Sequence, residues 1–97
     1  MARARFVVRG LVQGVNFRAA AVGEASRRAI TGRVWNRDDG AVELIAEGSE
    51  PALAAFQSWL NEGPRWAEVR EVERTDLAGE PRYDGFNITW SPPREVT

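Results

Sequence analysis

The chain has 97 residues, a mass of 10.8 kDa and a formal net charge of −1, and it contains no cysteine, histidine or lysine. These absences exclude disulfides, thiolate and imidazole catalysis, Cys/His zinc sites, Schiff bases and a P-loop lysine. Any reaction must therefore use backbone amides, arginine, carboxylates, hydroxyls or side-chain amides. The length predicts one domain over residues 1–97. Its tail at 91–97, which contains Pro92-Pro93, is expected to be loose.

The charges are unevenly distributed along the chain. Residues 1–37 carry eight arginines and one acid, whereas residues 38–97 carry five arginines and thirteen acids. The basic first third fits an anionic partner, or else a small sheet in which strands from both halves interleave. The acidic pI of about 5.5 argues against a nucleic-acid partner. Without a signal-peptide pattern or a membrane-spanning apolar run, we expect a cytoplasmic protein with no membrane partner, and a monomer.

Alternation, helical spacing and turn residues predict the following elements in chain order. They are a strand at 5–11, a helix at 18–29 stopped by Gly32, a hairpin with strands at 33–37 and 41–47, a helix capped by Ser49 and ended by Gly63, and strands at 67–75 and 84–90. This order predicts an α+β fold, a ferredoxin-like βαββαβ sandwich. Both helices would pack on one face of a mostly antiparallel sheet, with an additional C-terminal strand.

The loop Val12-Gln13-Gly14-Val15-Asn16-Phe17 joins the first predicted strand to the first helix, which Arg18 opens. Amides at a helix start and in a tight turn attract anions, and Gly14 lets the backbone curl closely. Arg18 adds a planar fork of donors that matches phosphate oxygens. These features fit a phosphate cradle without a metal and a plain strand-to-helix loop with a solvated arginine equally well.

Asn36 lies two residues before the turn Asp38-Asp39-Gly40 and shares the predicted inner side of its strand with Val34. A polar amide there needs a partner. Binding a ligand and bonding the turn backbone are both open explanations.

The four tryptophans raise the question of base stacking. Trp35 is predicted on the opposite side of the strand from Asn36, where it could lie on an open sheet face. An RNA-binding sheet would need more aromatic side chains on that face. Trp66 and Trp90, at strand ends, are expected to pack or to cover an edge, and Trp59 belongs to the apolar stripe of the second helix.

The stretches G-L-V-Q-G-V-N-F-R at 10–18 and G-R-V-W-N-R-D-D-G-A-V-E at 32–43 resemble the acylphosphatase family. The signature of that family pairs V-Q-G-V-x-F-R with G-x-V-x-N-x-x-D-G-x-V-E, and the resemblance covers about residues 4–90. Two positions depart from the commonest form. Leu11 stands where a basic or polar residue is frequent, and Arg33 stands where tryptophan is usual. Both departures bear on substrate preference.

The resemblance implies a hydrolase that converts small acyl phosphates to a carboxylate and inorganic phosphate, without a metal, a cofactor or a covalent intermediate. It implies that Arg18 and Asn36 are the catalytic residues, with Asn36 holding the attacking water. It also implies a phosphate site made of Arg18 and the backbone amides of Gln13, Gly14, Val15, Asn16 and Phe17. The alternative is a non-catalytic phosphate-binding or accessory module of the same fold.

Overall fold

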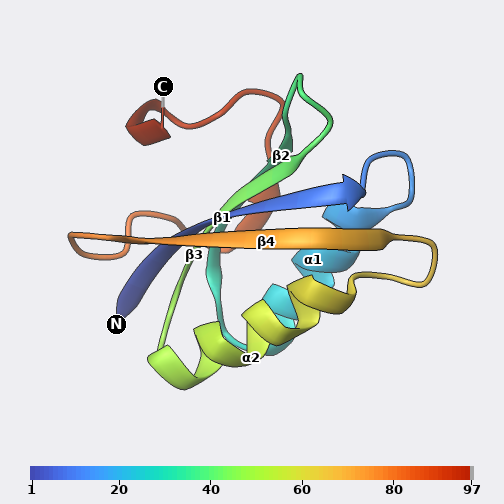
Figure 1. Ribbon diagram of the computed structural model, residues 1–97. Coiled ribbons are helices and arrows are strands. Elements are labelled where there is room, and N and C mark those ends of the chain that lie inside the picture. Colours follow the sequence, from blue (N-terminus) through green and yellow to red (C-terminus); the bar gives the residue numbers. More distant parts are fainter. Residues whose placement is uncertain (97) are drawn as a thin grey trace.

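The computed structural model describes residues 1–96 (Figure 1). Its strands are β1 (Ala2–Leu11), β2 (Thr31–Asn36), β3 (Val42–Gly48), β4 (Glu68–Leu77) and β5 (Phe86–Ile88), and its helices are α1 (Phe17–Arg27) and α2 (Glu50–Glu62). The strands form a sheet in the order β4-β1-β3-β2-β5. Neighbouring strands are antiparallel except β2 and β5, which run parallel. The predicted ferredoxin-like α+β fold with an additional C-terminal strand is confirmed.

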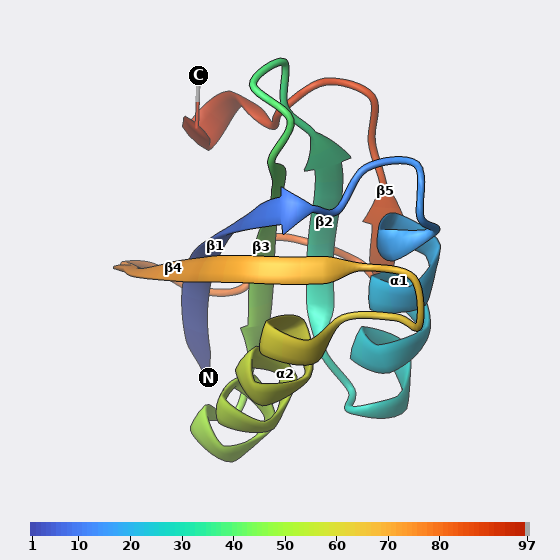
Figure 2. The same cartoon turned by 45° about the vertical axis from the view of Figure 1, so that its right-hand side comes forward.

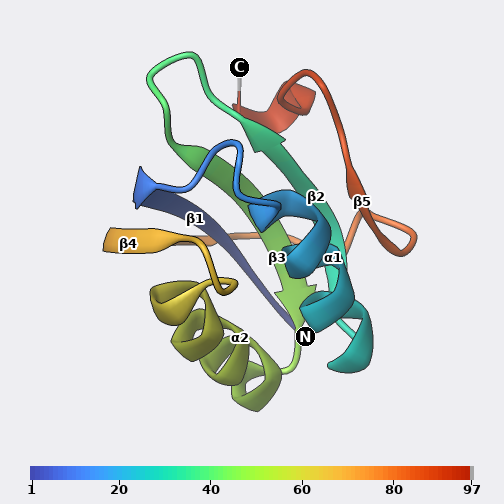
Figure 3. The ribbon, with the colours of Figure 1, turned by 90° about the vertical axis from the view of Figure 1, so that its right-hand side faces the viewer.

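Both helices cover the same face of the sheet, and the apolar core lies between the two layers (Figures 2 and 3). The inner face of α1 carries small side chains, Ala21 and Ala25, which are fully buried. The inner face of α2 carries Leu53, Phe56 and Leu60, also fully buried. Small residues let α1 lie close to the sheet, where its first turn faces Asn36 of β2 and Ile88 of β5. No helix among residues 1–96 is long and apolar enough to span a bilayer.

The end of α1 differs from the prediction, because Gly32 does not stop this helix. Ala29 takes the left-handed conformation (φ 56°), and the amide of Ile30 donates to the carbonyl of Ala25 at 2.9 Å. This closes the helix as a Schellman turn. Gly32 lies in β2, where a Cβ atom would come within 1.9 Å of the carbonyl oxygen of Ile45. Its missing side chain serves the close approach of two strands.

The hairpin of β2 and β3 forms where the Asp-Gly turn predicts it. Asn36 pairs with Val42 at the turn end of the two strands. The amide of Arg37 then donates to the carbonyl of Ala41 at 2.9 Å, and Gly40 takes a positive φ of 93°. Asn36 therefore lies at the very end of β2, on the last rung of the sheet before the turn.

Of the tail predicted to be loose, 91–97, the described part up to residue 96 contacts the sheet face that the helices leave open, and residue 97 lies outside the described residues. Residues Arg94–Val96 form a 3-10 turn, and Glu95 accepts hydrogen bonds from Nη2 of Arg3 at 2.8 and 2.9 Å and from the hydroxyl of Tyr83. Trp35, on this face, is only 2% exposed, so it offers no open stacking surface.

Three other tryptophans are less enclosed than Trp35. Trp59 is half-buried and stacks on Phe56, with ring centroids 6.1 Å apart. Trp66 and Trp90 are 71% and 84% exposed, so of the two expected roles, packing or edge cover, packing in the core does not apply to them.

Candidate active site

The loop between β1 and α1 has the backbone conformation of an anion-binding turn. Gly14 and Asn16 both take positive φ angles, 77° and 66°. Asn16 is the N-cap of α1, yet its side chain makes no capping hydrogen bond, so the amides of the first turn stay available. Left-handed residues close together in a turn gather successive amides into a concavity that binds anions. The positive end of the helix dipole adds to this preference.

This loop lines a cavity of about 340 Å³ together with the end of β2. The lining residues are Val12, Gln13, Gly14, Asn16, Phe17, Arg18, Ala19, Asn36 and Ile88. Six of the seven residues that the sequence analysis selects thus converge on one space. The seventh, Val15, is half-buried with its side chain against the core, so only its backbone can serve a ligand.

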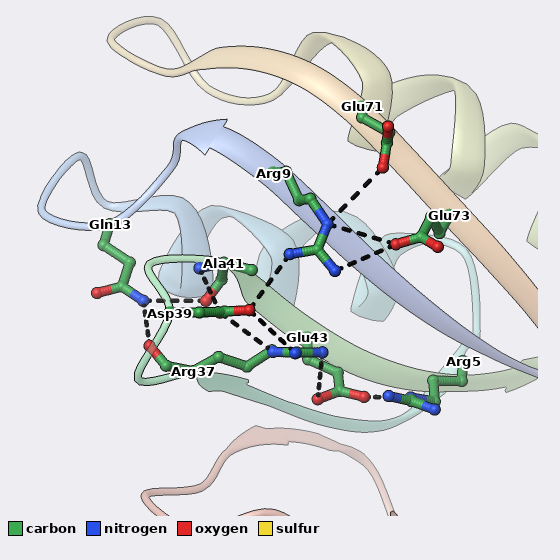
Figure 4. A network of polar contacts seen from close by, with 9 residues as sticks. All are labelled: Arg5, Arg9, Gln13, Arg37, Asp39, Ala41, Glu43, Glu71 and Glu73. Carbon is green, nitrogen blue, oxygen red and sulfur yellow. Dashed lines mark hydrogen bonds and ion pairs between the residues drawn. The ribbon is translucent and has the colours of Figure 1, made fainter.

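The side chain of Gln13 fixes this loop to the β2–β3 hairpin. Its Nε2 donates to the carbonyl oxygens of Arg37 at 2.8 Å and Ala41 at 2.9 Å (Figure 4). Both acceptors belong to the hairpin turn that follows Asn36. Only the backbone amide of Gln13 was predicted to belong to the site, because nothing local to the sequence indicates this side-chain contact.

A group of charged side chains holds the hairpin turn from the outside (Figure 4). Asp39 accepts from Arg9 Nη1 at 3.2 Å and from Arg37 Nη2 at 3.0 Å. It also accepts from the amide of Ala41 at 3.1 Å. This amide and the Arg9 guanidinium hold the pKa of the Asp39 carboxyl below its ordinary value. The turn is thus tied to β1 through Arg9 as well as through Gln13.

Asn36 brings a buried polar atom without a partner to the cavity. Its Oδ1 is buried and accepts no hydrogen bond from any residue in 1–96, so the turn-bonding explanation does not apply to this oxygen. Buried polar atoms are nearly always satisfied, and an exception at a cavity wall calls for a ligand or a water molecule.

Arg18 approaches the same cavity from the first turn of α1. Within residues 1–96 it forms no ion pair with a carboxylate, so its charge is available to a bound anion. Its Cζ lies 5.3 Å from the ring centroid of Trp90. The contact of Trp90 with Arg18 was not predicted from the sequence, because only the pairing of β5 with β2 brings Trp90 to this position.

The two positions that depart from the family pattern lie away from this cavity. Arg33 stacks on Tyr83, with its Cζ 4.9 Å from the ring centroid. Leu11 is 53% exposed at the end of β1. Neither residue lines the cavity. In the described part of the chain, no group of three or more acidic, histidine or cysteine side chains is placed to hold a metal ion.

Comparison with known proteins points to one family. The Acylphosphatase family model matches residues 4–88. The acylphosphatase of Pasteurella multocida is 40% identical over 90 residues, which cover 93% of this chain and all of that protein. The acylphosphatase of Xanthomonas oryzae pv. oryzae is 45% identical over 84 residues, covering 87% and 96%.

Solved structures agree with these sequence relatives. The crystal structure of acylphosphatase from Bacillus subtilis superposes with a TM-score of 0.89 at 38% identity, covering 93% of this chain and all of that one. An acylphosphatase structure from Coxiella burnetii gives 0.86 at 34% identity, covering 91% and 92%.

Proposed function

The chain belongs to the acylphosphatase family, and we propose that it hydrolyses the carboxyl–phosphate anhydride bond of small acyl phosphates in the cavity between Arg18 and Asn36. It is an enzyme of this class, an acylphosphatase. One observation carries the assignment of the site. The amide loop, Arg18 and Asn36 all line this cavity, and within residues 1–96 Arg18 has no carboxylate partner and the buried Oδ1 of Asn36 accepts no hydrogen bond.

In the proposed mechanism, the loop holds the phosphoryl group of the substrate. The amides of residues 13–17 and the guanidinium of Arg18 donate to the three nonbridging oxygens of the phosphoryl group. These donors face the oxygens on which negative charge concentrates in the transition state, and stabilisation of this kind is often worth about 3 kcal/mol per donor. Because phosphoryl transfer needs mainly positioning and charge stabilisation, this set of groups is sufficient.

Asn36 orients the attacking water. A water molecule donates a hydrogen bond to the buried Oδ1, which directs an oxygen lone pair toward phosphorus. The water oxygen forms a bond to phosphorus while the bond from phosphorus to the acyl oxygen breaks. The electron pair of the breaking bond leaves with the carboxylate. The protons of the water pass to phosphate and solvent.

The missing residue types do not hinder this reaction. The leaving group is a carboxylate, whose conjugate acid has a pKa of about 4, so it departs as an anion without a general acid. Water as nucleophile replaces a cysteine or lysine. A phosphomonoesterase, which must expel an alkoxide, would need a general acid to protonate the leaving group.

Several finer expectations belong to this proposal. We expect residues 1–97 to act as one domain, as a monomer in the cytoplasm, with no metal, no cofactor and no nucleic acid. The acidic pI and the enclosed Trp35 support the last of these.

The experiment is hydrolysis of benzoyl phosphate by the purified protein in the presence of a chelator, beside Arg18→Ala and Asn36→Ala. We expect turnover with chelator, and a loss of kcat of about a hundredfold or more in each variant. Circular dichroism checks that the variants fold. Phosphate binding without turnover would instead favour the non-catalytic module, and undiminished turnover in both variants would place the site elsewhere.

A further inference from the structure

Trp90 lies outside the part of the chain that the family model matches, yet it contacts the proposed phosphate-binding arginine. The match ends at residue 88. The Cζ of Arg18 lies 5.3 Å from the centroid of the Trp90 ring, a distance at which a guanidinium and an aromatic face attract each other. The indole is 84% exposed, so it buries little of itself in the core. Its contact with Arg18 therefore needs an explanation other than packing.

The position of Trp90 is set by the same strand that carries Asn36. β5 pairs in parallel with β2, where Ile88 pairs with Val34, and the amide of Thr89 extends this pairing by donating to the carbonyl of Val34 at 2.9 Å. Trp90 follows directly. β2 thus places Asn36 at one side of the cavity and, through its pairing with β5, also places the indole of Trp90 beside Arg18.

Arg18, like Arg33 and Arg65, is contacted by an aromatic ring, whereas other arginines of the chain are held by carboxylates. Arg9, Arg37 and Arg74 are each held by carboxylates at 3.2 Å or less. A carboxylate beside Arg18 would occupy its donors and repel a bound phosphate. An aromatic ring orients a guanidinium through its face, which leaves the N–H groups at its edge free and keeps the positive charge uncancelled.

We infer that Trp90 is a positioning residue of the proposed phosphate site: its indole holds the Arg18 guanidinium by the face so that the edge is presented to the phosphoryl group. This inference rests on the proposed function only in that the cavity binds phosphate. Trp90 does not touch the reacting atoms, and it acts through Arg18 alone.

The test measures binding of inorganic phosphate by NMR titration of the loop amides, without any turnover. Trp90→Ala is compared with the wild type, with Trp90→Phe and with Trp66→Ala. Trp66 is a matched control, since it is also exposed and also lies against an arginine, Arg65, at 5.2 Å. We expect Trp90→Ala to raise the Kd for phosphate about two- to fivefold, Trp90→Phe to restore most of the affinity, and Trp66→Ala to change nothing.

A double-mutant cycle separates positioning from general structural support. In the Arg18→Ala background, Trp90→Ala is expected to cause no further loss of phosphate affinity, because the residue it positions is gone. An unchanged Kd in Trp90→Ala, or the same loss with and without Arg18, would overturn the inference. If the protein did not hydrolyse acyl phosphates but Trp90 and Arg18 were still coupled in phosphate binding, the inference about Trp90 would hold and the proposed hydrolysis would be wrong. The failure of one can therefore be told from the failure of the other.

Discussion

The Nε2 of Gln13 lies 2.8 Å from the carbonyl oxygen of Arg37 and thereby joins the proposed phosphate-binding loop to the strand end that carries Asn36. The two proposed catalytic groups, Arg18 and Asn36, come from different elements, α1 and β2. Their separation depends on how the loop sits against the hairpin. Gln13 is therefore expected to set the distance between the bound phosphoryl group and the water.

Replacing Gln13 with Leu tests this connection. Both hydrogen bonds to the hairpin are lost, and a small displacement between phosphate and water is costly for the rate, so we expect kcat to fall about tenfold or more. The free energy of unfolding should fall by about 1–2 kcal/mol, as for two lost hydrogen bonds. Gln57→Leu, on α2, removes a contact to Arg74 away from the cavity and serves as the control. A Gln13→Leu enzyme with wild-type kcat would contradict the role.

Replacing Asn36 with Leu should separate activity from stability. The buried Oδ1 has no partner within residues 1–96, and an unsatisfied buried oxygen costs about 1–3 kcal/mol, so its removal should not lower the free energy of unfolding. The attacking water loses its acceptor, and kcat should fall about a hundredfold. Urea unfolding and steady-state kinetics measure the two quantities. A clear loss of stability would show that Asn36 serves the fold instead.

The buried carboxylate of Glu47 is expected to make the fold sensitive to acid. It accepts from Arg3 Nε at 2.8 Å, from Thr31 Oγ1 at 2.9 Å, and from the amides of Arg82 and Tyr83 at 2.8 and 3.0 Å. Burial alone would raise the pKa of this carboxyl, but the hydrogen bond from Arg3 and the two amides outweigh it, so the pKa is lowered from 4.5.

Because the pKa of Glu47 is lower in the folded than in the unfolded chain, its contribution to stability is complete above pH 4.5 and is lost as the pH falls through the folded value. Glu47→Gln should cost about 3 kcal/mol at pH 7 and show a weaker dependence on pH between 5 and 3. Urea unfolding at several pH values measures both. Exposed Glu62→Gln is the control, and equal acid sensitivity of wild type and Glu47→Gln would refute the role.

Tyr83, the chain's single tyrosine, should ionise at unusually high pH. Burial and the hydrogen bond to Glu95 raise its pKa from 10.0 to about 12. The protonated form is thus favoured in the folded chain, so its contribution to stability is complete below pH 10 and is lost as the pH rises toward 12. Absorbance at 295 nm follows the ionisation.

A matched variant assigns the cause of this shift. Glu95→Gln removes the negative charge beside the hydroxyl, so the pKa of Tyr83 should move back toward 10. If the titration midpoint of Tyr83 were the same in wild type and Glu95→Gln, the proposed contact with the C-terminal segment would be refuted.

The local elements of the fold could be predicted because each has a short-range signal. The Asp-Gly turn specifies the β2–β3 hairpin, and the apolar stripe of Leu53, Phe56 and Leu60 specifies α2. The prediction that Gly32 ends α1 was wrong. A glycine that follows a helix in the sequence suggests a C-cap, even when its structural role lies in the next strand. Gly32 allows the close approach of β2 and β3. Only the tertiary structure shows this, because a Cβ atom at position 32 would lie 1.9 Å from the carbonyl oxygen of Ile45.

By itself, the sequence determined which chemistries are absent, which loop offers amides and an arginine to an anion, and that Asn36 is a polar residue on an inner strand position. These properties depend on residue types and on spacings of a few residues. Tertiary structure alone decided that Gln13 holds the hairpin, that the Asn36 oxygen has no partner among residues 1–96, and that Trp90 lies against Arg18. Each of these relationships joins residues far apart in the chain. Pairing of distant strands creates them, and no local pattern of side chains encodes which strands will be neighbours.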